Sequence, residues 1–427
     1  MENNKLKKGT STIKFLSSRF KQEKYKMERI FQFLDYLKEK ELSPVFYNIE
    51  SAGTEPEVII DGKRYLMFSS NNYLGLSTNS RVIEEAKRAL KKHGIGPGGS
   101  RFLCGNIDVL RKLDREIAEL VETEDAITFP TGYMANLAIF KALMDPVVGN
   151  SPYKKGSGVI FSDEFNHGTI IDGCRLSHAR KVVFQHNNFQ DLKNKISKIP
   201  KRNHKMIVTE GVFSPEGEIS PLSEIVKIAN DYNAVLMVDD AHGVGVLGEK
   251  GGGTVQHLGL QGQVDIIMGS FDKALGGTGG FLAGNKKLIE YLRKIARPYL
   301  LSSAIPAVMA GGLIEAIKIC KSSSDLREKL FDNANYLRKN LQKLGFQILG
   351  DKKVPVIPVL IGDEVDAMKF SDKLFQENIY APCFRWPVVP KKTSRIRVTP
   401  MSTHDRHHLD ALIEAFEKTG KKLKLIS

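Results

Sequence analysis

The fold is indicated most directly by the stretch AVLMVDDAHG, which covers residues 234–243. Its first half is an apolar run, and its second half holds two aspartates and a histidine. Such a strand is typical of a parallel sheet with helices on both faces, because these sheets bind ligands at the carboxyl ends of their strands. Asp239 is then placed to pair with a protonated ring nitrogen or a metal ion. The structural alternative is an aspartate that caps the following helix.

Six further apolar runs surround this stretch. They are AITF (126–129), GVIF (158–161), KVVF (181–184), MIVT (206–209), DIIMGS (265–270) and GGFLAG (279–284), with amphipathic helical patterns between several of them. This alternation predicts an α/β fold with a mostly parallel, seven-stranded sheet. Ahead of it, residues 57–69 are expected to form a hairpin that turns at Asp61-Gly62.

The pattern changes after Pro306. Helices are expected over about 306–345, strands near 346–361 and 394–399, and a final helix from Asp405. A chain of 427 residues is too long for one core. We therefore expect a basic, partly helical extension (1–45), a large domain (46–305) and a smaller C-terminal α+β domain (306–427).

The N-terminal extension contains one short apolar stripe at helical spacing, formed by Met27, Ile30, Phe31, Leu34 and Leu37. We expect this helix to pack on the protein or on a partner subunit. The alternative is a helix that lies at a membrane surface. No stretch is apolar enough to span a bilayer, and basic residues interrupt the N-terminus where a signal peptide needs an apolar block.

The chain is basic, with 63 Lys and Arg against 49 Asp and Glu and a formal net charge of +14. These residues are spread along the chain without an RNA-recognition or zinc-finger signature, so no nucleic-acid partner is expected. A lysine-rich surface or attraction for an anionic substrate explains the charge instead. The four cysteines form no CxxC pair, which argues against a metal site or disulfides and favours a cytoplasmic setting.

A second motif, GSFDKALGG (269–277), follows the apolar run DIIM. A lysine among small residues at the mouth of a sheet can approach an aldehyde cofactor and act as a nucleophile. Lys273 is that candidate, and an exposed loop lysine is the alternative. Ser270 is placed to bind a phosphate. There is no GxxxxGK[ST], and the glycines of 276–280 precede a strand, so neither common nucleotide-binding loop is present.

Two weaker signals point to the same kind of ligand. At Thr131-Gly132-Tyr133 a strand meets a helix, and backbone N–H groups at a helix N-terminus bind anions. His167 follows the run GVIFSDE, where its ring is placed to stack on a flat cofactor. Taken alone, a loop histidine is more often structural.

Taken together, these motifs resemble the α-oxoamine synthase family of fold-type I pyridoxal-phosphate enzymes. The similarity runs from about Phe46 to the C-terminus. Besides the two motifs above, it includes NNYLGLS (71–77), GGSRFLCG (98–105), TGYMAN (131–136), NHGTIIDGCRLS (166–177), EGVFSPEGE (210–218), RPYLLSS (297–303) and RIRVTPMSTH (395–404). The sequence departs from the family pattern at Asp272, where a small or hydroxyl residue usually precedes the lysine.

The resemblance implies a role for each matching residue. Lys273 would hold pyridoxal 5′-phosphate as a Schiff base and remove the Cα proton, and Asp239 would pair with the ring nitrogen. His242 and Ser214 would lie at the phenolic oxygen, and His167 would stack on the ring. The remaining assignments are Gly132, Tyr133 and Ser270 at the phosphate, Arg397 at the amino-acid carboxylate, Asn72 in the substrate pocket, and Ser302 and Ser303 at a second subunit's phosphate site. A homodimer with a shared active site is therefore expected.

The family joins an amino acid to an acyl thioester, with loss of CO2 and release of the thiol from CoA or an acyl carrier protein. Serine palmitoyltransferase-like enzymes, which would use serine and a long acyl chain, are most similar to this chain in three segments. These are FYNIES (46–51), VIIDGKRYLMFSSNNYLGLS (58–77) and IIDGCRLS (170–177). Residues 357–370 and 387–398 are closer to glycine C-acetyltransferase, and GGSR also suits 8-amino-7-oxononanoate synthase. A plain aminotransferase on the same fold is the alternative class. Lys273 argues against a non-catalytic partner subunit.

Overall fold

The computed structural model describes residues 27–36, 38–39, 46–145 and 156–426, and the chain divides into two compact units, 1–48 and 49–427. In the first unit residues 27–36 are helical, and four members of the predicted stripe, Met27, Ile30, Phe31 and Leu34, are exposed. The fifth, Leu37, lies outside the described residues. Among the described residues, no helix combines the length and apolarity needed to cross a membrane.

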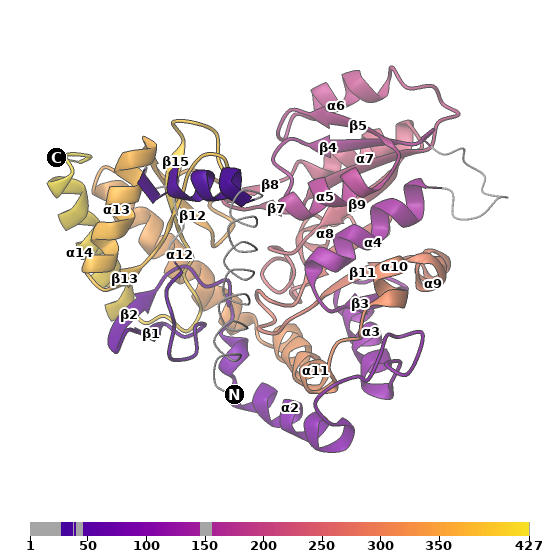
Figure 1. The fold of residues 1–427 in the computed structure, drawn as a ribbon, viewed down its shortest axis with the longest axis horizontal. Coiled ribbons are helices and arrows are strands. Elements are labelled where there is room, and N and C mark those ends of the chain that lie inside the picture. The colour runs from indigo at the N-terminus through magenta and orange to yellow at the C-terminus, as the bar shows by residue number, and fades with distance from the viewer. Residues whose placement is uncertain (1–26, 37, 40–45, 146–155, 427) are drawn as a thin grey trace, which may run out of the picture. The chain divides into compact units, whose positions relative to one another are not determined.

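The second unit is built on a seven-stranded sheet (Figure 1). Its strand order is β3-β11-β10-β9-β6-β4-β5. The strands are β3 (Asp125–Phe129), β4 (Val159–Asp163), β5 (Arg180–Phe184), β6 (Lys205–Glu210), β9 (Val235–Asp239), β10 (Ile266–Ser270) and β11 (Gly280–Gly284). Only β11 runs opposite to the other six strands of this sheet. The predicted mostly parallel, seven-stranded sheet is confirmed.

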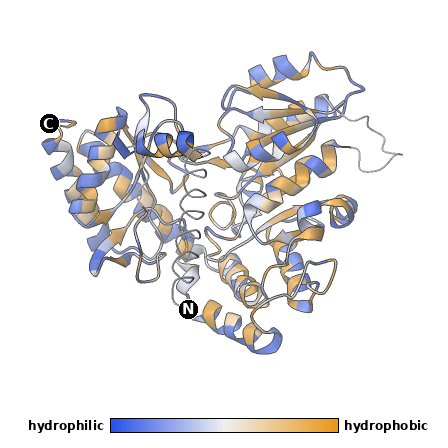
Figure 2. Ribbon diagram, viewed as in Figure 1, coloured by the Kyte–Doolittle hydropathy of each residue, from blue (hydrophilic) through white to orange (hydrophobic). Residues whose placement is uncertain are grey.

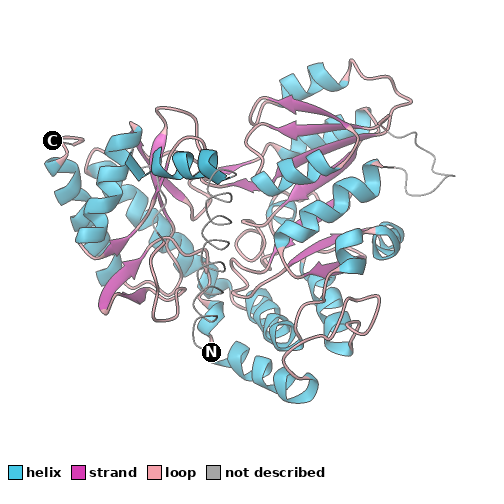
Figure 3. Cartoon of the chain, in the orientation of Figure 1, coloured by secondary structure: helices cyan, strands magenta, loops and turns pink. Residues whose placement is uncertain are grey.

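Helices cover both faces of this sheet because its strands are apolar on both sides (Figures 2 and 3). In β9, Leu236 and Val238 join one buried cluster while Met237 joins the other, as alternation along a strand requires. The first cluster includes residues of α2 (Ser80–His93), α3 (Asp108–Leu120), α6 (Phe189–Ile196), α7 (Leu222–Asp231), α8 (Thr254–His257) and α11 (Ala307–Ser322). The second includes residues of α4 (Gly132–Met144), α5 (Gly168–Leu176), α9 (Lys286–Ile295) and α10 (Arg297–Leu301).

A third buried cluster lies mainly in the C-terminal part of the chain. It joins two small sheets, β1-β2-β13 and β12-β15-β14, to three helices. These elements are β1 (Glu57–Ile60), β2 (Lys63–Met67), β12 (Ile357–Gly362), β13 (Ile379–Tyr380), β14 (Cys383–Phe384), β15 (Ser394–Val398), α12 (Ser324–Lys343), α13 (Glu364–Gln376) and α14 (Arg406–Lys422). The predicted hairpin turns at Asp61 and Gly62, whose φ angles of 48° and 72° suit a type I′ turn.

The domain limits at 45/46 and 305/306 stay predictions. The third cluster includes Phe68, and α11 contributes to the first cluster although it follows Pro306. Residues before and after Pro306 therefore pack in the same cores. Folding of the isolated segments would test where the domain boundary lies.

Candidate active site

A cavity of about 590 Å³ lies where the parallel strands β4, β6, β9 and β10 end. The carboxyl ends of parallel strands share one edge of the sheet, so side chains that follow them in sequence meet there. Most of the predicted site residues line this cavity, namely Gly132, Tyr133, His167, Ser214, Asp239, His242, Ser270, Lys273 and Arg397.

Lys273 reaches the cavity from the loop that follows β10. Its side chain is 14% exposed, and its Nζ atom lies 3.7 Å from the carboxylate of Asp272. Close packing of glycines holds this loop in place. A Cβ atom on Gly245 would lie 2.5 Å from that of Ala274, and one on Gly276, whose φ is +68°, would lie 2.3 Å from the backbone nitrogen of Ser77. The backbone that carries Lys273 is thus held at the cavity wall.

Asp239, at the end of β9, is a buried carboxylate that accepts two hydrogen bonds. They come from the Asn136 side-chain amide at 2.8 Å and the Ala241 backbone N–H at 3.2 Å. Its neighbour across the sheet is Glu210, also buried. Burial, and then the charge of Asp239, raises the pKa of Glu210 well above its usual value. Neither acid forms an ion pair with any described residue, so this end of the cavity suits a cationic N–H.

His242 is held by a tyrosine that sequence reasoning did not assign. Its Nδ1 atom lies 2.8 Å from the hydroxyl of Tyr73. Burial raises the pKa of Tyr73, so its hydroxyl keeps its proton. Burial, with Lys273 and Arg397 nearby, lowers the pKa of His242 well below its usual value. A neutral imidazole has one N–H. When Tyr73 donates to Nδ1, that N–H is on Nε2, ready to donate to a ligand oxygen.

His167 is the N-cap residue of α5. Its backbone N–H donates to the Glu210 carboxyl at 2.6 Å, and its Nδ1 atom lies 2.9 Å from the Thr169 hydroxyl. Glu210 therefore links the His167 loop to the sheet edge that carries Asp239. The ring of His167 is exposed on the cavity wall, where it is free to stack on a flat ligand.

The predicted anion site lies at the start of α4. Thr131 caps this helix by accepting the Met134 N–H at 3.1 Å, and the first-turn N–H groups of a helix lack partners within it. A Cβ atom on Gly132 would lie 3.3 Å from Oγ of Ser270, so the serine packs against the helix start. Tyr133 instead directs its hydroxyl to Asp172, at 2.5 Å. The first-turn N–H groups of α4 and the hydroxyl of Ser270 thus lie close enough together to donate hydrogen bonds to one phosphate.

Arg397 brings a buried cation to the wall of the same cavity. Its Nη1 donates to Ser214 Oγ at 3.0 Å, and its Cζ lies 4.8 Å from the centre of the Phe384 ring. Burial lowers the pKa of Arg397. Among the described residues the hydrogen bonds of this guanidinium go to a hydroxyl and a carbonyl and none to a carboxylate, and its Nε atom has no hydrogen-bond partner. Its Nη2 atom donates to the Ser69 carbonyl at 3.4 Å, so one N–H on each Nη atom is left for a substrate carboxylate.

Three predicted residues, Asn72, Ser302 and Ser303, do not line the cavity. Asn72 is buried in its own loop, where its amide donates to Thr54 O and Ser77 Oγ at 3.1 and 2.9 Å. The adjacent Asn71 lines the cavity instead, and its Oδ1 atom has no partner among the described residues. The assignment of Asn72 to the pocket wall is corrected to Asn71, because neighbouring side chains on an extended loop point in different directions. Ser303 is exposed after α10, and its expected role in a second subunit stays a prediction.

These groups fit pyridoxal 5′-phosphate at three separate places. A buried carboxylate without a cation suits the ring nitrogen, a helix start with a serine suits the phosphate, and an amine suits the aldehyde. The buried oxygens of Asn71 and Asn136 also lack a partner in the described chain. Such atoms are expected where a ligand completes a hydrogen-bond network.

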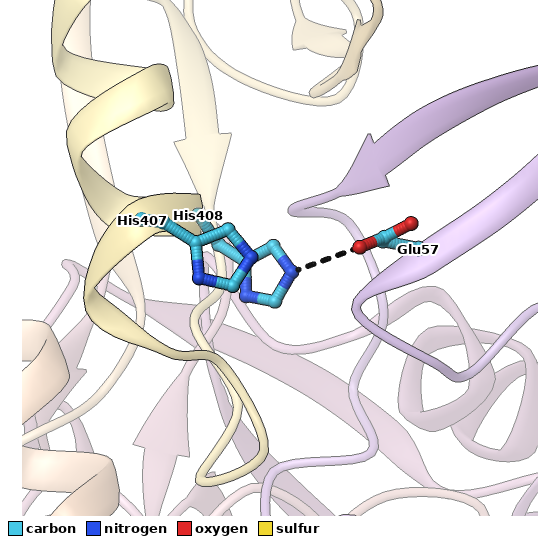
Figure 4. A group of neighbouring side chains, drawn as sticks. All are labelled: Glu57, His407 and His408. Carbon is cyan, nitrogen blue, oxygen red and sulfur yellow. Dashed lines mark hydrogen bonds and ion pairs between the residues drawn. The ribbon is translucent and has the colours of Figure 1, made fainter.

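A separate group of side chains, Glu57, His407 and His408, has ligand atoms within 4.8 Å of one another (Figure 4). The contacts of His408 explain it as a helix cap. Its Nδ1 atom accepts the Asp405 N–H at 3.0 Å, which leaves its proton on Nε2, 3.4 Å from Glu57. A metal ion at Nε2 would move that proton to Nδ1, against the Asp405 N–H, so we assign no metal to this group.

Comparisons with known proteins agree with this geometry. The aminotransferase class I and II family matches residues 63–416. The chain is 42% identical to the 8-amino-7-oxononanoate synthase of Thermoanaerobacter pseudethanolicus, over 92% of this chain and 98% of the relative. It is 41% identical to the same enzyme of Lysinibacillus sphaericus, over 88% and 94%.

Solved structures give the same grouping. A serine palmitoyltransferase of Sphingomonas wittichii superposes with a TM-score of 0.88 at 28% identity, over 95% of this chain and 99% of that one. That of S. paucimobilis, solved with a bound PLP adduct, gives 0.87 at 29%, over 94% and 99%. An 8-amino-7-oxononanoate synthase of Francisella tularensis gives 0.72 at 26%, over 84% and 98%.

Proposed function

The chain belongs to the α-oxoamine synthase family of class I and II aminotransferase-like enzymes, and from this premise we propose that it joins alanine to a seven-carbon acyl thioester that ends in a carboxylate. The enzyme is a C-acyltransferase that depends on pyridoxal 5′-phosphate and condenses an amino acid with an acyl thioester. The cofactor, when bound, supplies an electron sink for the carbon that loses its proton.

The observation that carries the proposal is the identity of 41–43% with 8-amino-7-oxononanoate synthases over most of both chains. The product name fixes the carbon count. Carbons 8 and 9 with the amino group match alanine without its carboxylate, and carbons 1–7 match a seven-carbon acyl group with a terminal acid. The loop that follows β14 supports an anionic donor, because Val388 of the cavity wall shares it with the cations Arg385, Lys391 and Lys392.

We assign the site residues as follows. Lys273 would hold the cofactor aldehyde and carry the Cα proton, and Asp239 would keep the ring nitrogen protonated. His242 would donate to the phenolic oxygen, with Ser214 beside it, and His167 would stack on the ring. The phosphate would be held by the backbone of Gly132 and Tyr133, by Ser270 and by Ser303 of a second subunit, and Arg397 would bind the amino-acid carboxylate next to Asn71.

Release of free thiol from a panel of acyl-CoAs tests the substrate assignment. The panel crosses acetyl, palmitoyl and a seven-carbon dicarboxylic monothioester with glycine, alanine and serine. We expect release chiefly with alanine and the dicarboxylic donor. Release with serine and palmitoyl-CoA would favour the second candidate, a serine palmitoyltransferase-like enzyme, which the TM-scores of 0.87–0.88 support. Amino-acid-dependent transamination without thiol release would indicate an aminotransferase.

We also propose a homodimer in the cytoplasm. The expected role of Ser303 requires a second chain, and the four cysteines are unpaired, as in a reducing compartment. Sedimentation of the purified protein tests the assembly. A protein that stays monomeric at the concentration where it is active would contradict it.

Contact of the N-terminal helix with a membrane is a further hypothesis, because Ile30, Phe31 and Leu34 of its apolar stripe are exposed. If the stripe anchors the enzyme, deletion of residues 1–40 should release it from vesicles of anionic lipid and lower activity with long-chain donors. Vesicle co-sedimentation of the full chain and the deletion variant measures this. Equal partition and equal activity would argue against the contact and leave packing on protein as the role of this helix.

A further inference from the structure

A histidine outside the cavity connects two of the loops that build it. His186 follows β5, and its side chain is only 12% exposed. Its Nδ1 atom lies 2.9 Å from Asp163, which ends β4, and its Nε2 atom lies 3.1 Å from Glu218 of β8 (Glu218–Ile219). It is not among the residues that line the cavity.

Contacts to two carboxylates require two ring donors, and only the imidazolium form of histidine has both. Burial opposes this charge, but the hydrogen bonds to Asp163 and Glu218 outweigh burial and raise the pKa of His186 to about 9. Asn187 strengthens the same bridge. Its backbone N–H donates to Asp163 at 2.9 Å, and its side-chain amide donates to Glu218 at 3.2 Å.

The first arm of this bridge leads to His167. Asp163 Oδ1 accepts the Phe165 N–H at 2.9 Å, and the ring of Phe165 stacks on His186 with centroids 4.4 Å apart. Phe165 precedes His167 by two residues. The position of the imidazolium therefore sets where the His167 loop leaves the sheet.

The second arm leads to Ser214. Glu218 belongs to a short hairpin in which β8 pairs with β7 (Val212–Phe213), and Ser214 follows β7 directly. The ring of Phe213 meets His186 edge-on, with centroids 4.5 Å apart. Ser214 in turn accepts the hydrogen bond from Arg397. The hairpin thus connects His186 to the guanidinium that faces the cavity.

The other charges around the bridge are part of the same arrangement. The His186 backbone N–H donates to Glu164 at 2.8 Å. Glu216, on the hairpin, lies 3.7 Å from Arg395, which precedes Arg397 by two residues on β15. The charges that surround His186 and respond to a change in its own charge are therefore those of Asp163, Glu164, Glu216, Glu218 and Arg395.

We propose that the His186 imidazolium is a positioning residue that sets the spacing between the His167 loop and the Ser214–Arg397 arm, and thereby the affinity for the amino acid. The inference rests on the proposed function in taking His167 and Arg397 as contacts of cofactor and substrate.

The test compares His186→Gln, Glu218→Gln and wild type, all loaded with cofactor. The amino-acid Kd is read from the change in cofactor absorbance, and kcat is measured alongside it. We expect His186→Gln to retain the cofactor, to weaken amino-acid binding roughly tenfold, as for a lost charge-assisted hydrogen bond, and to change kcat less. Glu57→Gln, which removes the acid next to His408 at a distance from the cavity, is the matched control and should leave Kd and kcat unchanged.

Stability against pH gives a readout that needs no substrate. A histidine with a raised pKa stabilises the fold fully below about pH 6.5, and this contribution is lost as pH rises towards about 9. The unfolding midpoint of the wild type should therefore fall between pH 6.5 and 9 more than that of His186→Gln. The Glu218→Gln fall should begin at the same pH but end at a lower pH and be smaller, because one acid that holds the proton is gone.

Two outcomes would overturn the proposal. If His186→Gln lowers the unfolding midpoint but leaves the amino-acid Kd and its pH profile unchanged, the residue is only structural. If wild type shows no absorbance response to any amino acid, the proposed function fails, and this inference fails with it. The two failures are distinguishable because only the second affects the wild-type protein.

Discussion

Replacement of Lys273 by alanine is expected to abolish both turnover and the absorbance of the lysine-bound cofactor. The amine is the only lysine nitrogen that lines the described cavity, and no neighbouring group can replace it in covalent attachment. Loss of a nucleophile that also transfers a proton costs about four orders of magnitude or more in kcat. Absorbance spectra of the purified variant and thiol release measure the two effects.

Two further variants separate charge from chemistry at this position. Lys273→Arg keeps a cation near Asp272 but cannot form the linkage, so it should be as inactive as the alanine variant. Lys250→Ala changes an exposed lysine outside the cavity and should behave like wild type. A Lys273→Ala protein with a normal spectrum and normal turnover would refute the assignment.

The second large effect is expected for Asp239→Asn. The amide has nearly the shape of the carboxylate but no charge to keep the cofactor ring nitrogen protonated. Because Asp239 is buried and no described cation pairs with it, the partner that loses stabilisation is the ring itself. Truncation of one side of a buried charge pair costs about 2–5 kcal/mol, so kcat should fall by roughly 30- to 5,000-fold. Steady-state kinetics with a measured cofactor content would show this.

The adjacent aspartate provides the matched control. Asp240 is fully buried, and its carboxylate accepts both the N–H and the hydroxyl of Thr254 at 2.6 Å. Asp240→Asn places an amide N–H against one of these donors and should lower the unfolding midpoint, with little change in the rate per folded enzyme. Equal kinetic losses for both variants would mean that Asp239 has no special relation to the cofactor.

The sequence predicted the sheet well because buried parallel strands are short apolar runs with clear ends. All seven predicted runs became strands whose limits differ by a residue or two, and polar residues at the ends of β4, β6, β9 and β10 line one cavity. By contrast, β7 and β8 have two residues each and were not predicted. Strands that short have no detectable period, and tertiary contacts such as those of His186 hold them.

The predictions at the site were limited in a different way. Residue type and position after a strand were sufficient to select Asp239 and Lys273, but they could not decide which of Asn71 and Asn72 faces the cavity. Tyr73 and Asn136 lie in motifs that sequence analysis quoted, yet their partners are 169 and 103 residues away along the chain. No local pattern encodes such contacts. Glu210 ends a buried strand, and that position was the available signal for it.

Borohydride reduction of the cofactor-loaded protein, followed by peptide mapping, shows directly whether Lys273 holds the cofactor. Reduction fixes the cofactor to the amine that holds it, so the modified peptide identifies the lysine without any assumption about substrate. We expect a phosphopyridoxyl group on Lys273 and no modification of that peptide without cofactor. A label on another lysine, or no label on any, would contradict this assignment.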